Sequence, residues 1–185
     1  NAGMGTKALI VGYGSIGRRH ARVVKPLVEE VAVVTSQLVA GHRHFSSLAE
    51  AVHEFRPDYA VICTATASHA DSLNVLRKSG FTGQALVEKP LFMRAVQDAG
   101  PYPFPIRVAY QLRFHKVIAA LKAALEHRRG LSAHVYVGQH LGQWRPGRDV
   151  KTTYSASRAQ GGGVLRDLSH ELDLAGWLFG GTEKW

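Results

Sequence analysis

The stretch KALIVGYGSIGRRHARVV, residues 7–24, decides how the amino-terminal part of the chain folds. Four apolar residues precede three glycines, Gly12, Gly14 and Gly17, and a helical pattern follows them. A buried strand, a tight turn and a helix start in this order are what a dinucleotide site requires. Gly12 would permit the turn, Gly14 would let the backbone approach a pyrophosphate, and Gly17 would let the helix pack closely on the strand. An ordinary strand–helix turn is the alternative.

Length and composition set the class of protein. The 185 residues, 45% of them hydrophobic, are enough for one full domain and part of a second. No apolar run reaches the length of a membrane span, and no signal peptide is visible. The single cysteine, Cys63, lies in an apolar strand pattern, which excludes a disulfide framework and a cysteine metal cluster. We therefore expect a cytoplasmic protein that needs neither a metal nor a membrane.

The net charge of +9 raises the question of nucleic acid as a partner. The basic residues do not form one block: Arg18, Arg19 and Arg22 lie in the first helical pattern, and most others are scattered. A basic surface that also suits anionic phosphates is therefore favoured over a nucleic-acid groove. Nucleic-acid binding is kept as an alternative, and it predicts a steep dependence of binding on salt.

The rest of the amino-terminal part alternates between strand and helix patterns. Each apolar strand ends in a polar loop, which predicts an α/β fold with a doubly wound parallel sheet and a site along its carboxyl edge. A capping-box pattern at Ser47 to Glu50 marks the start of one helix. The further strands are expected at residues 30–35, 59–63, 84–87 and 106–110, and the helices between them near residues 48–55 and 70–78.

The end of the second strand bears on the choice of cofactor. An acid about 20 residues past the glycines normally binds the ribose hydroxyls of NAD. Here the strand ends in Thr35-Ser36-Gln37, without an acid, and Arg43 follows between two histidines. A missing carboxylate removes repulsion of a 2′-phosphate, and hydroxyls and cations could bind one. The pattern therefore favours NADP over NAD, unless these side chains point to solvent.

The carboxyl-terminal part reads as the beginning of a second domain. We expect a dinucleotide-binding domain over residues 4–112 and a partial α+β domain over residues 113–185. Residues 131–141 alternate in places and predict one strand of a new sheet, and a helix is expected from the glycines at 161–163 to Gly180. A lone strand is not stable by itself, so we expect either a truncated form or a homo-oligomer in which another chain supplies the pairing.

The last helical pattern carries titratable side chains beside its apolar stripe. Asp167, His170 and Asp173 are spaced three residues apart, so they are neighbours on a helix surface. A carboxylate beside an imidazole orients the ring and fixes its tautomer, as a proton-transfer group needs. A solvated helix face with incidental charge pairs is the alternative, and the spacing leaves open which acid is the partner of His170.

Several of these pieces together resemble the glucose-fructose oxidoreductase / inositol dehydrogenase / MocA family of NAD(P)-dependent oxidoreductases, whose first domain is a Rossmann fold. The matching parts span nearly all of the chain: the glycine loop, the segment 64–69, Glu88-Lys89-Pro90, the segment 110–115, and the helix pattern 161–173.

The resemblance implies roles for single residues. Lys89 would lie between nicotinamide and substrate, His170 would be the acid/base with an aspartate near it, and His69 would lie beside the nicotinamide. Asp167 precedes His170 by three positions where four is commoner in the family, and the Pro-Asn usual before His69 is missing. The candidate cofactor-binding residues are Gly12, Gly14, Ser15, Ile16, Gly17, Thr35, Ser36, Arg43, Thr64, Ala65, Thr66, His69, Glu88 and Lys89.

The predicted function is that of an NAD(P)-dependent dehydrogenase acting on a secondary alcohol of a sugar, cyclitol or nucleotide sugar. Lys89, His170, Asp167 and Asp173 are the candidate catalytic residues. Aromatic and cationic side chains suit a hydroxyl-rich ligand, and the candidates for the substrate wall are Tyr110, Arg113, Trp144, Arg145, Arg148 and Tyr154. A nucleotide-binding protein without catalysis, such as a sensor or a truncated remnant, is the alternative.

Overall fold

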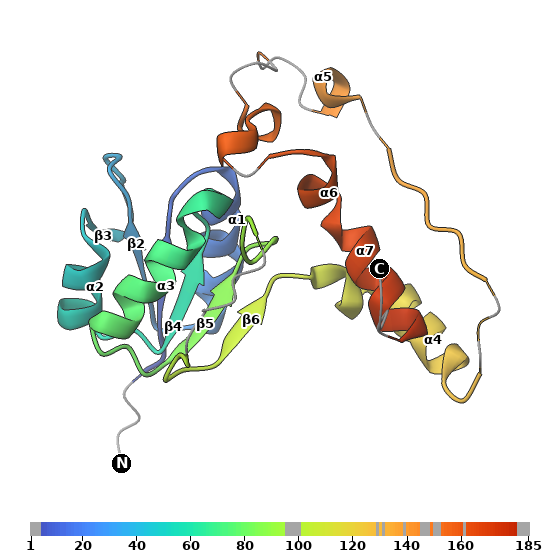
Figure 1. The fold of residues 1–185 in the computed structure, drawn as a ribbon. Helices are drawn as coiled ribbons and strands as arrows, with labels where there is room; N and C mark the ends of the chain where they lie inside the picture. Colours follow the sequence, from blue (N-terminus) through green and yellow to red (C-terminus); the bar gives the residue numbers. More distant parts are fainter. Residues whose placement is uncertain are drawn as a thin grey trace. The chain divides into compact units, whose positions relative to one another are not determined.

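Six parallel strands form the core of the amino-terminal part in the computed structural model (Figure 1). The structure describes residues 5–94, 101–128, 130, 132–138, 140–144, 149, 153–160 and 162–180. The strand order is β3-β2-β1-β4-β5-β6, and every neighbouring pair is parallel. The strands are β1 (Lys7–Val11), β2 (Glu30–Val34), β3 (Arg43–Phe45), β4 (Tyr59–Ile62), β5 (Gln84–Val87) and β6 (Ile106–Val108).

Helices cover both faces of this sheet, which confirms the doubly wound parallel architecture. On one face, α1 packs through Ala21 against Ile10, Val33 and Val61. On the other face, α2 and α3 pack against a second apolar cluster that contains Phe55. These helices are α1 (Ser15–Val24), followed by η1 (Lys25–Leu27), α2 (Leu48–Phe55), and η2 (Thr66–Ser68) leading into α3 (His69–Lys78).

Local sequence signals explain where these elements begin and end. The Ser47 side chain accepts a hydrogen bond from the Glu50 N–H at 3.4 Å, so the predicted cap of α2 forms. Arg56 has a left-handed conformation with φ of 52° directly after α2, and Pro57 follows it. The sequence did not indicate β3, whose three residues pair with Ala32 to Val34 of β2.

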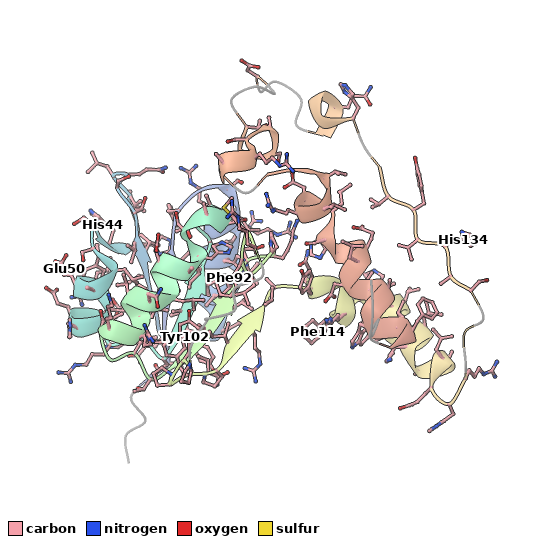
Figure 2. The ribbon with its side chains drawn as sticks, viewed as in Figure 1. His44, Glu50, Phe92, Tyr102, Phe114 and His134 are labelled. Atoms are coloured by element: carbon pink, nitrogen blue, oxygen red, sulfur yellow. The ribbon has the colours of Figure 1, made fainter. Side chains whose placement is uncertain are left out.

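Aromatic side chains complete the core at the β5–β6 side of the sheet. Phe104 is buried, packs edge-on against Phe81 with ring centroids 5.1 Å apart, and is partnered by the half-buried Tyr102. Phe92, labelled in Figure 2, packs on the larger apolar cluster that contains both Phe55 and Phe104. No helix or strand forms in the described residues between β5 and β6, as the sequence predicts.

The chain divides into two units, Asn1–Ala109 (unit 1) and Tyr110–Trp185 (unit 2). The described residues of unit 2 form only short 3-10 and α-helices. These are η3 (Gln111–Phe114), α4 (Lys116–Leu125), α5 (Leu141–Trp144), η5 (Tyr154–Ala156), η6 (Arg158–Gln160), α6 (Val164–Asp167) and α7 (Ser169–Phe179). No helix in the described part of the chain is long and apolar enough to cross a membrane.

The strand expected over residues 131–141 is wrong for the part that the structure describes. Residues 132–138 form no strand, and α5 begins at Leu141. The alternating apolar side chains have no neighbouring strand to complete a hydrogen-bond ladder, so the pattern alone does not produce one. Instead, Val135 and Val137 line an apolar groove of about 400 Å³ together with Leu165 and Leu172 of α6 and α7.

Candidate active site

The glycine loop after β1 closes because two of its glycines have no side chain. Gly12 has φ of +90°, and a Cβ there would lie 3.0 Å from the Cys63 carbonyl carbon and the Thr64 nitrogen. A Cβ on Gly17 would lie 2.0 Å from the Gly12 carbonyl oxygen. Gly12 therefore allows the turn and the approach of β4, and Gly17 lets α1 approach the loop, as the sequence analysis expects of both residues.

Gly14 differs from both, because its surroundings are open. It precedes the first residue of α1, and no described atom lies within 4 Å of the position that a Cβ would take. The side-chain oxygen of Thr64, after β4, is buried and has no hydrogen-bond partner among the described residues. Both features lie at the carboxyl ends of β1 and β4, where the strand order reverses and where open α/β sheets bind ligands.

These features fit a dinucleotide. The open side of Gly14 leaves room for a phosphate diester at the start of α1, where backbone N–H groups lack helical partners. Ser15 and Ile16 are the first two helical residues there and are exposed. The Thr64 hydroxyl would gain a partner from a bound ligand, which offsets the cost of burying it alone.

The end of β2 carries the residues expected to choose between cofactors. The Thr35 side chain accepts a hydrogen bond from the Gln37 N–H at 3.2 Å, and the Thr35 N–H donates to the Phe45 carbonyl at 3.0 Å. Ser36, between them, is exposed. The Gln37 amide oxygen accepts a hydrogen bond from Arg18 of α1 at 3.1 Å. The Arg18–Gln37 hydrogen bond therefore links the turn after β2 to α1.

Arg43, expected at the cofactor, is directed elsewhere. Its guanidinium pairs with Glu54 at 3.3 Å and lies over the rings of Phe45 and Phe55, at 4.9 and 5.9 Å. Glu54 and Phe55 are the last residues of α2, whose carboxyl end faces away from the carboxyl edge of the parallel sheet. The prediction did not account for this aromatic and acidic surface, which attracts the guanidinium.

His69 is an interior residue that joins two loops. It is 1% exposed, and both of its ring nitrogens face carbonyl oxygens. Nδ1 lies 3.1 Å from the carbonyl oxygens of Pro90 and Leu91, and Nε2 lies 3.1 Å from that of Thr64. His69 therefore holds the loop after β4 against the loop after β5. In the first of these loops Thr66 is buried and Ala65 is exposed.

The Glu88-Lys89-Pro90 segment follows β5 directly. The Glu88 N–H continues the ladder to the Ile62 carbonyl at 2.9 Å, and the Lys89–Pro90 peptide bond is cis. The Glu88 carboxylate pairs with Nε2 of His20 in α1 at 2.6 Å, with both side chains largely buried. Lys89 itself is half-buried. Lys89, the expected catalytic lysine, therefore directly follows Glu88, whose side chain is paired with α1.

Sequence reasoning did not find the pair of His20 and Glu88. The two residues are 68 positions apart, and only the adjacency of β1, β4 and β5 brings them together. Burial raises the pKa of the neighbouring Cys63 thiol, and the Glu88 carboxylate raises it further. Cys63 is thus a neutral interior residue. Among the described residues, no group of His, Cys, Asp and Glu could hold a metal ion.

The helix expected to present Asp167, His170 and Asp173 is interrupted. Leu168 has φ of −103° and ψ of 30°, which separates α6 from α7. Asp167, which is buried, ends α6, whereas His170 and Asp173 lie in α7. The prediction of one continuous helix is wrong at this position, so the helical spacing does not relate Asp167 to His170. The sequence did not reveal the break, because Val164, Leu165 and Leu168 continue the helical spacing of apolar residues across it.

Asp173 is the partner of Arg113 in unit 2. The Arg113 Nε donates to one carboxylate oxygen at 2.8 Å, and a second nitrogen donates to the other oxygen, so the pair is bidentate. This hydrogen bond to Asp173 raises the pKa of the Arg113 guanidinium. The guanidinium also lies 5.9 Å from the rings of Tyr110 and Trp177. Arg113 therefore joins η3 to α7 in a structural contact, although the sequence analysis placed it on the substrate wall.

The surroundings of His170 include a second predicted wall residue. The Tyr110 ring meets the His170 ring edge-on with centroids 5.7 Å apart, and the Gln111 amide nitrogen lies 3.4 Å from His170 Nε2. The remaining predicted wall residues cannot be placed in the same way. The backbones of Trp144 and Tyr154 belong to α5 and η5, but their side chains lie outside the described part of the structure, as do all of Arg145 and Arg148.

A parallel sheet with a glycine loop at its switch point defines a dinucleotide-binding α/β protein. Residues 6–100 match the family model of the Gfo/Idh/MocA proteins, described as an oxidoreductase family with an NAD-binding Rossmann fold. The match covers 95 of the 185 residues, and the chain belongs to this family. No curated protein sequence matches the chain.

Solved structures with a similar fold include dehydrogenases in complex with NAD or NADH. The WlbA (WbpB) dehydrogenase of Thermus thermophilus, solved with NAD and UDP-GlcNAcA, superposes with a TM-score of 0.71 at 21% identity, over 95% of this chain and 63% of its own. The WlbA dehydrogenase of Bordetella pertussis, solved with NADH and UDP-GlcNAcA, has the same TM-score and identity, over 94% and 58%. GenD2 of gentamicin A biosynthesis, solved with NAD, has a TM-score of 0.72 at 20% identity, over 95% and 54%.

This chain thus spans between about half and two thirds of the length of these structures. At sequence identities of 20% to 21%, this similarity shows a shared fold.

Proposed function

We propose that this chain carries the cofactor site and catalytic residues of an NAD(P)-dependent dehydrogenase that oxidises a secondary alcohol of a sugar, cyclitol or nucleotide sugar. The observation that carries the proposal is the site at the switch point. There the open Gly14 and the unpartnered Thr64 hydroxyl suit a dinucleotide, and Lys89 follows the adjacent strand. Membership of an NAD-binding oxidoreductase family supports it.

The reaction divides between a hydride and a proton. A bound nicotinamide cofactor would supply the hydride-accepting group, and the residues of the chain would handle the proton and the charge. In this proposal His170 takes the hydroxyl proton, with its ring held by the edge contact to Tyr110. The Lys89 ammonium stabilises the negative charge that develops on the same oxygen. Asp167 and Asp173 would set the charge around His170, with Asp173 acting through Arg113.

For the substrate, we propose a hydroxyl-rich ligand with an anionic group. Two similar structures are described in complex with UDP-GlcNAcA, a nucleotide sugar. The positive net charge of the chain suits such a ligand. Tyr110, Trp144, Arg145, Arg148 and Tyr154 are the proposed wall residues.

For the cofactor, we propose that NADP binds more tightly than NAD. No Asp or Glu occurs from residue 31 to residue 49, so the end of β2 offers no carboxylate to the ribose hydroxyls. The missing carboxylate also removes repulsion of a 2′-phosphate. The hydroxyls of Thr35 and Ser36, at the same strand end, could bind that phosphate. Placing a carboxylate there by Thr35→Asp should reverse the order of affinities.

The decisive experiment measures binding and turnover separately. Titration calorimetry on the full chain gives the affinities for NADP and NAD, and reduced-cofactor absorbance follows turnover with a panel of sugars, cyclitols and nucleotide sugars. Parent activity that falls by about 10²- to 10⁴-fold in His170→Asn, with unchanged cofactor affinity, would support proton transfer by His170. Tight dinucleotide binding without turnover of any compound would favour the alternative, a nucleotide-binding protein without catalysis.

A further inference from the structure

We propose that Arg18 recognises the 2′-phosphate of NADP, and that Gln37 holds its guanidinium in place at the end of β2. This inference rests on the proposed dinucleotide function and assigns its cofactor specificity to a residue of the first helix. It replaces Arg43, which the sequence suggested for this role.

The position of Arg18 follows from two contacts of its side chain. Its terminal nitrogen donates to the Gln37 amide oxygen at 3.1 Å, and its guanidinium carbon lies 5.7 Å from the centre of the Tyr13 ring. Tyr13 belongs to the glycine loop, and Gln37 lies three residues past β2. The cation is therefore held between the pyrophosphate loop and the strand end that receives the adenosine ribose in this fold.

The rest of the neighbourhood favours an anion. The His42 ring packs edge-on against Tyr13 with centroids 5.9 Å apart, so a second group capable of positive charge lies beside the same loop. The segment 31–49 contains no carboxylate. Arg43, the single arginine of this segment, has its guanidinium on Glu54 and two phenylalanine rings. Arg18 is thus the arginine that the contacts place at the strand end.

The geometry also explains how the two cofactors would be distinguished. A guanidinium presents several donors in one plane, which suits a phosphate monoester, whereas a neutral 2′-hydroxyl offers it little. Gln37 accepts one hydrogen bond from Arg18 without neutralising it. An acid at that position would pair with the cation and repel the phosphate. Gln37 therefore orients Arg18 and leaves its charge available.

The test compares two charge-neutralising variants of neighbouring helix residues. Arg18→Gln and Arg19→Gln remove the same charge from exposed positions of α1, but among the described contacts it is Arg18 that hydrogen-bonds to Gln37. Binding of NADP, NAD and adenosine 2′,5′-bisphosphate to the full chain is measured by calorimetry. We expect Arg18→Gln to weaken NADP and the bisphosphate about 10- to 100-fold while NAD affinity changes less than about twofold. Arg19→Gln should change neither cofactor by more than about twofold.

A second variant tests the role of Gln37 without removing the arginine. Gln37→Glu places a carboxylate beside Arg18 and should lower NADP affinity by a similar factor while sparing NAD. Thermal melts of each variant check that the fold is retained, which the exposure of both side chains favours.

The binding measurements distinguish a failure of the Arg18 assignment from a failure of the proposed function. If Arg18→Gln weakens NADP and NAD equally, the residue binds a shared part of the cofactor and the proposal is overturned. It is also overturned if Arg43→Gln, rather than Arg18→Gln, lowers NADP affinity selectively. If the parent chain binds neither dinucleotide, the proposed function itself fails. Parent binding of NAD and NADP with equal affinity would leave that function standing and overturn the assignment of Arg18.

Discussion

The two units of the chain bury different kinds of side chain. In the described residues, every buried hydrophobic side chain belongs to unit 1, between Ala8 and Phe104. The buried side chains of unit 2 are Ser155, Asp167 and Ser169, all of them polar. Burial of apolar surface is the main favourable term in folding. Unit 1 thus supplies the chief source of stability from its own strands and helices.

Unit 2 relies on polar contacts around one indole ring. Lys122 donates to the Trp177 carbonyl at 2.6 Å and lies 5.6 Å from the Trp177 ring centre, and Arg113 lies on the same ring. Meanwhile Leu165 is 72% exposed, Phe114 86% and Tyr136 94% (Figure 2 labels Phe114). Unit 1 therefore holds its glycine loop on an apolar core, whereas the side chains of unit 2 are held by more polar contacts.

Replacing Lys89 tests whether unit 1 also contributes to the chemistry. Lys89→Ala should lower turnover about 10²- to 10³-fold, because a charge that stabilises the reacting oxygen is lost. NADP affinity should change little, since the proposed function assigns phosphate binding to the backbone loop and α1. Steady-state rates and calorimetry separate the two effects. A parallel loss of cofactor binding would instead make Lys89 a phosphate-binding residue.

Two glycine variants sharpen the distinction between structure and binding inside unit 1. Gly12→Ala should lower the free energy of unfolding by about 1–3 kcal/mol, because φ of +90° is strained for alanine and its Cβ would meet the backbone of Cys63 and Thr64, just after β4, at 3.0 Å. Gly14→Ala should leave stability unchanged, since no described atom lies near its Cβ, but should weaken dinucleotide binding. Denaturant titrations and calorimetry measure both variants. Equal stability losses would contradict the open surroundings of Gly14.

The exposed apolar side chains of unit 2 predict self-association. Val135, Leu165 and Leu172 line the groove of about 400 Å³, and exposed apolar patches of this kind favour protein–protein contacts. We expect light scattering to show a homo-oligomer that dissociates on dilution. The double variant Leu165→Gln and Leu172→Gln should shift dissociation to higher protein concentration. A monomer at every concentration tested would contradict this prediction.

The smallest effect uses Cys63, the only cysteine of the chain, as a probe of unit 1. Its folded pKa is raised, so the folded thiol stays protonated where the unfolded thiol ionises. This stability is present in full below the unfolded pKa of about 8.5 and is lost as the pH rises further, by about 1 kcal/mol at pH 9. Unfolding titrations at pH 7 and 9 measure the slope, and Cys63→Ala should remove this contribution. Rapid reaction of native Cys63 with a thiol reagent at pH 8 would contradict its burial.

How far the sequence could predict the fold depended on how local the signals were. The strand at Lys7–Val11, the cap at Ser47 and the strand at Gln84–Val87 are each specified by a few consecutive residues, and all three form as predicted. The break at Leu168 and the absence of a strand over residues 132–138 were not foreseen. In both cases the apolar pattern continued, but hydrogen-bond partners and packing surfaces far away in the chain decide whether the element forms.

In the candidate site, too, local features follow from the sequence, whereas contacts between distant residues do not. By itself the sequence determined the glycine loop, because turn, close approach and helix start all follow from which residues lack a Cβ. It also determined the missing acid after the second strand and the position of Lys89, two residues past the end of a strand. Which side chains meet follows from the packing of the elements in space: His20 with Glu88, Arg18 with Gln37, and Arg43 with Glu54. These pairs join elements that parallel strands place side by side, and a pairing across the sheet leaves no periodic signal in the chain.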